Sequence, residues 1–249
     1  MPTPRRRFLI AALLALDLTT TSSSAFAQAG TRSSCPPATA EQPFQPEIPA
    51  LAPDPGLPAA VSGEASPAPD YRQHLRVTAL GPARLDHWCV WVDPITGSGP
   101  AALWEGRWHR AVQAALASWS RLLPITVVDR PEQAQILIER RRPPLQSSNG
   151  RWRASHGRAL LRLLSVERQG LWRLEPQVRV LIGPGQAEIP LQATALHELG
   201  HAFGLWGHSD RPGDALAAVP GPQPVLDLSL RDRSTLQWLY QQPTRFGRL

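Results

Sequence analysis

Apolar residues recur with two different periods along the chain beyond residue 71, and the two periods predict helices and strands. Between residues 108 and 123 they recur every three or four positions, which gives an amphipathic helix that Pro124 ends. Further helices are expected over residues 190–204 and 229–240. Short runs of β-forming residues, bounded mostly by Gly, Pro or Asp, predict strands at residues 88–93, 125–129, 134–139, 159–166 and 178–182.

The order of these elements predicts the fold class. It reads strand, long helix, several strands, second helix, loop and terminal helix. Strands and helices mixed in this way predict an α/β (α+β) fold, in which helices pack on a twisted sheet. The large apolar residues of the first helix are interpreted as core packing.

The first 70 residues have the pattern of a targeting segment followed by a linker. Residues 1–27 contain a basic start, a short apolar run and Ala25-Phe26-Ala27, which is typical of a signal peptide cleaved after Ala27. Residues 28–70 are crowded with prolines and predict an extended linker or pro-segment. The folded domain is therefore expected over residues 71–249, in an exported protein that is secreted or periplasmic.

The charge of the chain argues against some partners. All 26 basic residues are arginine, and removal of residues 1–27 takes away three arginines and one aspartate and leaves a net charge of +4. Arginine clusters at residues 140–142 and 151–158 are interpreted as solvated loops, so no nucleic-acid partner is expected. The apolar run at residues 8–16 is too short to span a bilayer, so no stable membrane insertion is expected after signal cleavage.

The chain has two cysteines, Cys35 and Cys89. In an exported protein they can form a disulfide, but Cys35 lies in the proline-rich segment, so the sequence leaves both the paired and the unpaired state open.

The stretch "HELGHAFGLWGHSD" over residues 197–210 carries the strongest chemical signal. On a helix, residues four apart share a face, so His197 and His201 can bind one metal ion, with Glu198 beside them. Three protein ligands and one open position are typical of a catalytic zinc, which acidifies water so that Glu198 can act as general base. Gly204 can turn the chain sharply after the helix and return a third ligand.

These residues resemble a known zinc-protease motif. His197, Glu198, His201, Gly204 and His208 resemble the metzincin pattern H-E-x-x-H-x-x-G-x-x-H, with one extra residue before His208. The neighbouring "LGHAFGL" and His208-Ser209, with the C-terminal "LSLRDRSTLQWLYQQPTR", look like the matrixin branch, in particular predicted cyanobacterial zinc proteases of that kind. The similarity covers most of residues 71–249.

The resemblance implies a metzincin-like fold and an activity. The expected fold has a twisted, mainly parallel sheet, two long helices and a small C-terminal subdomain ending in a helix. The implied function is a monomeric zinc (Zn²⁺) endopeptidase acting on peptide or protein substrates that pair with a sheet edge at residues 178–182 or the run before it. The alternative function is a catalytically weak zinc-containing module that binds peptide or protein.

The resemblance also raises three questions about single residues. The third ligand is expected to be His208, where the extra residue is absorbed in a wider turn and Gly207 supplies backbone freedom, or else Asp210. Metzincins place a methionine under the zinc, and here that position is expected to hold Leu216 or Ala217. Cys35 lacks the sequence context of an inhibitory thiolate, so it is not expected to bind the zinc.

Overall fold

The computed structural model describes residues 35–44, 69–148 and 151–248. The expected signal peptide lies outside these residues, as does most of the expected linker. Whether the domain is processed to begin at residue 71 therefore stays a prediction.

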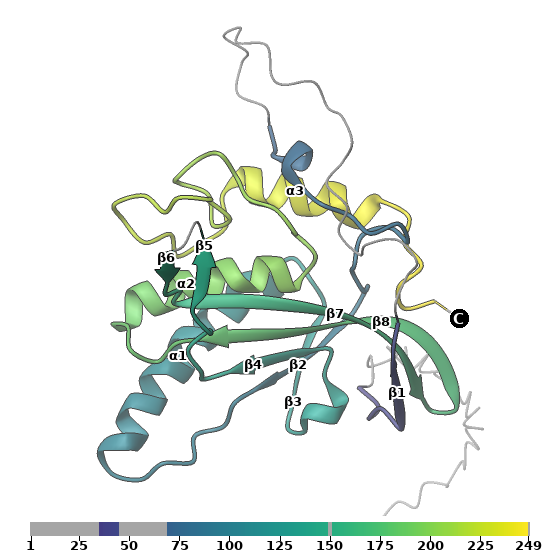
Figure 1. Cartoon of the computed structure of the whole chain (residues 1–249), viewed down its shortest axis with the longest axis horizontal. Helices are drawn as coiled ribbons and strands as arrows, with labels where there is room; N and C mark the ends of the chain where they lie inside the picture. The colour runs from purple at the N-terminus through teal and green to yellow at the C-terminus, as the bar shows by residue number, and fades with distance from the viewer. Residues whose placement is uncertain (1–34, 45–68, 149–150, 249) are drawn as a thin grey trace, which may run out of the picture. The chain divides into compact units, whose positions relative to one another are not determined.

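A six-stranded mixed sheet forms the centre of the fold (Figure 1). The strand order is β1-β7-β8-β4-β2-β3. The pairs β3–β2, β2–β4 and β4–β8 are parallel, whereas β8–β7 and β7–β1 are antiparallel. The strands are β1 (Ala40–Pro43), β2 (Trp88–Val92), β3 (Ile125–Val128), β4 (Ile136–Glu139), β7 (Gly157–Arg168) and β8 (Leu171–Ile182). A separate antiparallel pair joins β5 (Gln146–Ser148) to β6 (Arg151–Arg153).

The described residues form three α-helices. They are α1 (Pro100–Ser120), α2 (Glu188–Ala202) and α3 (Leu230–Gln241), and two 3₁₀ turns are η1 (Arg72–His74) and η2 (Pro131–Gln133). Of the three helices, α2 packs directly on β7 and β8. The indole N–H of Trp119 on α1 donates to the Leu196 carbonyl of α2 at 3.1 Å. In Figure 1, α2 lies between the sheet and α3. The sheet and α1 therefore determine where α2 lies.

The predicted α/β fold class is confirmed. The spacing of apolar residues that predicted it matches the residues that the fold buries. On α1 the residues buried by the fold are spaced by three or four positions, from Trp108 through Val112 and Ala115 to Trp119. The expected strands correspond to β2, β3, β4, β7 and β8. The last two strands reach twelve residues each, longer than their apolar runs, because their antiparallel pairing continues to Arg168 and Leu171 at the hairpin end.

One expectation about the sheet is wrong. Residues 178–182 were a candidate for the exposed edge, but β8 is hydrogen-bonded to β7 on one side and to β4 on the other. The run before it lies in β7, where β1 pairs only with residues 164–167. Among the described residues, positions 157–162 of β7 have no strand partner on their outer side.

The segment at residues 35–44 is part of the folded unit, although its composition resembles the linker around it. Cys35 forms a disulfide with Cys89 of β2, and Gln133 donates a side-chain hydrogen bond to the Cys35 carbonyl at 3.0 Å. The buried guanidinium of Arg168 pairs with Glu175 at 3.1 Å and donates to the Pro36 carbonyl. Covalent and polar contacts order this segment, which has little apolar surface to bury.

Of the two states that the sequence left open, Cys35 and Cys89 are in the paired one. A cystine fits a protein that matures in an oxidising compartment, and Cys35 has no free thiol with which to inhibit a metal site. Within the described ranges, no helix combines the length and the apolar character needed to cross a membrane.

Removing both sulfur atoms tests how much the disulfide stabilises the fold. Replacing Cys35 and Cys89 together by serine is expected to lower the free energy of unfolding by about 2 to 4 kcal/mol, because the unfolded chain loses a long cross-link. Urea unfolding of both proteins, with and without a thiol reductant, measures the difference. A reductant that leaves the unfolding midpoint of the unmodified protein unchanged would contradict this role.

Candidate metal centre

Helix α2 presents His197, Glu198 and His201 on the side of the helix that faces β7 and the loop after the helix. The helix packs closely at Gly200, between the two histidines. A Cβ atom at that position would lie 2.5 Å from Cδ2 of Leu216 and 3.1 Å from the Trp119 ring. Glycine is therefore needed at position 200, because the loop and α1 both approach the helix there.

The chain leaves α2 through a left-handed residue. Gly204 has φ +106°, a conformation that side chains rarely adopt, and the backbone N–H of Leu205 bonds to the Gly200 carbonyl at 3.0 Å. The sharp turn expected at Gly204 is confirmed, and it directs the following residues back toward the histidines.

The extra residue before His208 is accommodated by contact with another segment. The backbone N–H of Arg76 donates to the Trp206 carbonyl at 2.8 Å. A Cβ atom at Gly207 would lie 2.1 Å from the His74 carbonyl oxygen. Gly207 does not have a positive φ, so its role is close approach to the 74–76 segment rather than the backbone freedom that was expected.

The structure brings His197, His201 and His208 together. One ligand atom from each residue lies within 4.8 Å of the others. The ring centroids of His208 lie 5.3 Å from His197 and 4.9 Å from His201, and the two helix histidines are 4.9 Å apart. His208 is exposed and His201 is 9% exposed, so the cluster opens to solvent on one side.

Backbone hydrogen bonds orient the two helix histidines. Nδ1 of His197 lies 2.9 Å from the Ala215 carbonyl, and Nδ1 of His201 lies 2.7 Å from the Leu205 carbonyl. A carbonyl only accepts, so each Nδ1 carries the proton and each Nε2 keeps its lone pair. Ligating histidines commonly have such partners, and these side chains fit a metal ion.

Burial keeps all three imidazoles neutral. It lowers the pKa of His197 to about 4 and that of His201 to about 3, and it also lowers the pKa of His208. In the helix pair, proximity to other histidines adds to the effect. Neutral imidazole is the form that binds a metal ion, so the cluster is ready to do so near neutral pH.

Glu198 lies beside the histidines under strand β7. Burial raises the pKa of its carboxyl to about 7, although a backbone hydrogen bond from Ala159 and the charge of Arg158 act in the opposite direction. A Cβ atom at Gly157 would lie 2.6 Å from Cγ of Glu198 and from Cγ2 of Thr194. Gly157 therefore allows β7 to lie directly against the carboxylate, a requirement that the sequence pattern did not indicate.

A buried network holds the loop that orients His197. The fully buried Asp232, on α3, accepts from the Ala215 backbone N–H at 2.9 Å and from the Tyr71 hydroxyl at 2.7 Å. It also completes a capping box with Ser229. Sequence reasoning missed Asp232 and Tyr71 as supporting residues, and the spacing of Ser229 and Asp232 was the available signal.

Asp210, the alternative third ligand, has a different partner. Its carboxylate pairs with Arg231 at 2.8 Å, and that hydrogen bond lowers the pKa of the Asp210 carboxyl. Arg231 also pairs with the buried Asp214 at 2.7 Å. Asp210 is not part of the histidine cluster and instead helps to hold the loop.

Leu216 packs beneath the histidine helix, as expected. It is 0% exposed, and both of its methyl groups lie next to Gly200. Its carbonyl accepts from the backbone N–H of Ser209, the residue after His208, at 2.7 Å. Ala217, the other candidate for this position, is also buried, but it makes no such close approach to Gly200.

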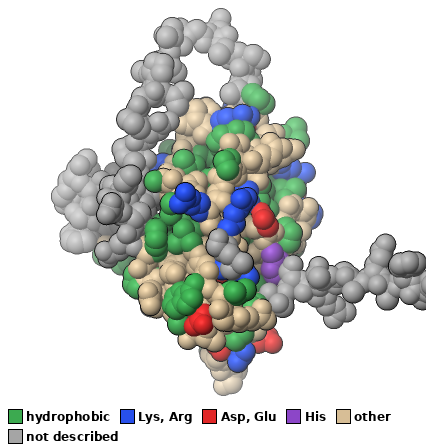
Figure 2. Space-filling view, turned by 90° about the vertical axis from the view of Figure 1, so that its right-hand side faces the viewer, with side chains coloured by type: hydrophobic (Ala, Val, Ile, Leu, Met, Phe, Trp, Pro, Cys, Tyr) green, Lys and Arg blue, Asp and Glu red, His purple; other side chains and the backbone are tan. Residues whose placement is uncertain are grey.

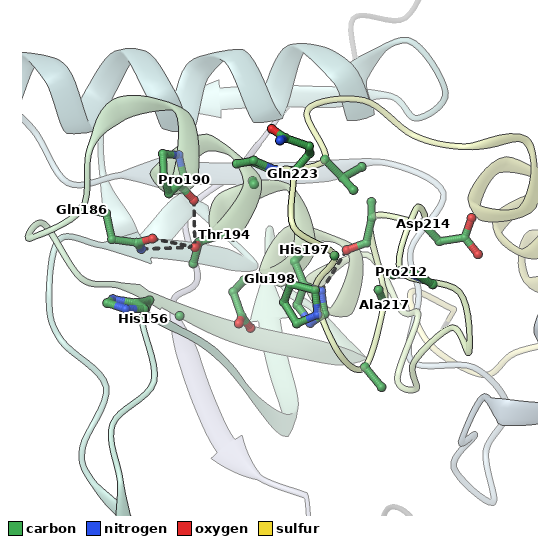
Figure 3. Close-up of a pocket in the computed structure, with 18 of the residues that line it drawn as sticks. His156, Gln186, Pro190, Thr194, His197, Glu198, Pro212, Asp214, Ala217 and Gln223 are labelled. Carbon is green, nitrogen blue, oxygen red and sulfur yellow. Dashed lines mark hydrogen bonds between the residues drawn. The ribbon is translucent and has the colours of Figure 1, made fainter.

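Two cavities flank Glu198 and His197. The first, which we call the proline cavity, measures about 410 Å³ and is walled by Pro212, Pro220, Pro222 and Pro224 (Figure 3). In that view Glu198 and His197 lie side by side, and Thr194 bonds to Gln186. The second, the arginine cavity, measures about 520 Å³ and contains His201, His208, Arg76 and Arg158.

A second group of metal-binding residue types lies elsewhere, at Cys35, His87 and Cys89. Both sulfur atoms belong to the disulfide, so they are not thiolates and this group is not a metal site in the oxidised protein.

No family model matches the chain, and no curated protein matches it at a significant level. Function is therefore inferred from the geometry and chemistry of the site.

The packing of Leu216 under the helix can be tested by substitution. Leu216→Met is expected to cost less than about 1.5 kcal/mol, because the two side chains have similar volumes. Leu216→Ala is expected to cost about 2 to 5 kcal/mol and to loosen metal binding, because it leaves a cavity beneath Gly200. Urea unfolding and metal titration check both variants. An alanine variant as stable and as metal-loaded as the parent would show that the site is supported in another way.

Proposed function

We propose that this protein is a zinc-dependent endopeptidase. The observation that supports the proposal most is the placement of three neutral histidines and one partly buried glutamate along an open sheet edge, between two cavities. The decisive experiment is metal analysis of the purified chain combined with digestion of a peptide library.

The histidine cluster suits zinc in particular. His197, His201 and His208 would supply three imidazole ligands, and the exposed side near His208 leaves a position open. A zinc ion held there would polarise the carbonyl of the scissile peptide bond and make a water molecule more acidic. Structural zinc sites usually have four protein ligands, so three ligands with an open side favour catalysis.

Glu198 is proposed as the general base. Its raised pKa, about 7, keeps its two protonation states close in energy at neutral pH. The carboxylate can accept a proton from the attacking water and then deliver it to the leaving amine. Gly157 lets β7 lie against this carboxylate, and the Ala159 backbone forms a hydrogen bond to it. The base therefore lies next to the open edge of β7.

The substrate is proposed to bind as an extended peptide along β7. Residues 157–159 line the cavities, and their outer edge has no strand partner among the described residues. A peptide added to this edge would form main-chain hydrogen bonds, and its side chains would enter the cavities.

We further propose that the chain is a matrixin-like metzincin, acting as an exported monomer after signal-peptide removal. The zinc motif, the mixed sheet, the glycine turn and the C-terminal helix support this assignment. The departure from the family is Leu216 in place of methionine. Since a methionine sulfur in that position is not a ligand, the leucine is compatible with the proposal.

A catalytically weak zinc module that binds peptide or protein is the second candidate function. The same cluster and cavities would serve it, but such a module would have no need of a buried base beside the cluster. Zinc bound at one ion per chain without peptide cleavage would favour it.

The proposal includes no nucleic-acid partner, and this stays a prediction. In Figure 2, the arginine side chains of the described residues on that face are interspersed with hydrophobic and other side chains. In that view they do not form one continuous basic surface.

Replacing the base separates chemistry from metal binding. Glu198→Gln is expected to keep its zinc and to lose about 10²- to 10⁴-fold in kcat/KM, because the ligands remain while proton transfer is lost. Elemental analysis and a fluorogenic peptide assay measure the two effects. Unaltered turnover in this variant would refute the assigned mechanism.

A pair of loop variants tests the third ligand. His208→Ala is expected to lose most of its zinc on dialysis, since two ligands alone hold the ion poorly. Asp210→Ala is the matched control and is expected to keep its zinc, because Asp210 pairs with Arg231. The opposite result, with zinc lost only from the Asp210 variant, would make Asp210 the third ligand.

A further inference from the structure

Two arginines from different segments of the chain line the arginine cavity. Arg158 is the second residue of β7 and pairs with Leu181 of β8 in the sheet. Arg76 lies in the segment that bonds to the Trp206 carbonyl through its own backbone N–H, at 2.8 Å. Both line the same cavity as Glu198 and His208. Backbone hydrogen bonds therefore fix where each long side chain starts.

The residues that line this cavity carry more positive than negative charge. Neither Arg76 nor Arg158 forms an ion pair with another described residue. Glu198 is the sole acidic residue among those that line the cavity. His197, His201 and His208 line the same cavity as the two arginines, so both positive charges lie close to the histidine cluster.

We propose that the arginine cavity binds a carboxylate of the substrate, on an aspartate or glutamate side chain close to the scissile bond. This inference rests on the proposed peptidase function and adds a substrate class to it. Guanidinium groups bind carboxylates through paired, charge-assisted hydrogen bonds. A peptide lying along β7 would pass both cavities, so an acidic side chain on one side of the scissile bond would meet both arginines.

The proline cavity, which we place on the other side of the scissile bond, has a different lining. Prolines and alanines form much of its lining, Gln186, Thr194 and Gln223 supply neutral polar groups, and its charged side chains are those of Glu198 and Asp214. No arginine lines it. The acidic preference is therefore expected on one side of the scissile bond only.

Arg162 provides a matched control for loss of charge. It lies on the same strand as Arg158, and its Nη1 lies 3.5 Å from Oε1 of Gln177. It lines neither the proline cavity nor the arginine cavity. Replacing it removes one positive charge from β7 and leaves the cavity as it is.

The test uses peptides that differ only by Glu against Gln. Once the cleavage position in a library peptide is known, each of three positions on either side of the bond is varied. The glutamate peptide is expected to be preferred by about tenfold in kcat/KM at one or two positions on one side. Arg76→Gln and Arg158→Gln should each reduce the preference, whereas Arg162→Gln should keep it. Equal rates for all peptide pairs, or the same loss in the Arg162 variant, would overturn the proposal.

A binding measurement separates this inference from the proposed function. Zinc-loaded Glu198→Gln protein is titrated with the glutamate peptide, the glutamine peptide and a C-terminally amidated glutamate peptide, and thermal melting confirms that every variant is folded. Tighter binding of both glutamate peptides supports a side-chain carboxylate, whereas loss of binding on amidation would assign the cavity to the peptide terminus and overturn the proposal. If the unmodified protein hydrolyses no peptide, but the Glu198→Gln protein still binds the glutamate peptides more tightly than the glutamine peptide, the proposed peptidase function is rejected and the carboxylate site stands.

Discussion

The hydrogen bond from the Ala215 backbone to the buried Asp232 carboxylate is the contact on which the rest of the site depends. It fixes a turn that makes three separate contacts with the histidine cluster. The Ala215 carbonyl orients His197, the Leu216 side chain fills the space at Gly200, and the Leu216 carbonyl holds the residue after His208. Since Asp232 belongs to α3, the terminal helix supports the histidine cluster through this turn.

Three glycines around the histidine cluster allow close packing. Gly157, Gly200 and Gly207 each lie where two backbones, or a backbone and a buried side chain, approach more closely than a Cβ atom would allow. Close packing of this kind removes freedom from the side chains around it. This packing therefore restricts the positions of the histidines and Glu198.

The parts of the fold that the sequence predicts are those that depend on local pattern. The spacing of Trp108, Val112 and Trp119 gives α1, and the spacing of His197 and His201 gives their common face on α2. The parts that it does not predict depend on pairing between distant segments. The edge position of β7, the ordering of β1 and the approach of Arg76 to the histidines all result from contacts between distant residues, for which one chain contains no periodic signal.

The disulfide between Cys35 and Cys89 changes what a break in the chain would mean. Strand β1 lies before residue 45 and is hydrogen-bonded to β7, whereas the histidine cluster and all three helices lie after residue 69. A single peptide-bond cleavage between residues 45 and 68 would produce two polypeptides but not two molecules. The shorter polypeptide would stay in the sheet as a covalently attached strand, and it would separate from the longer one only after reduction and unfolding.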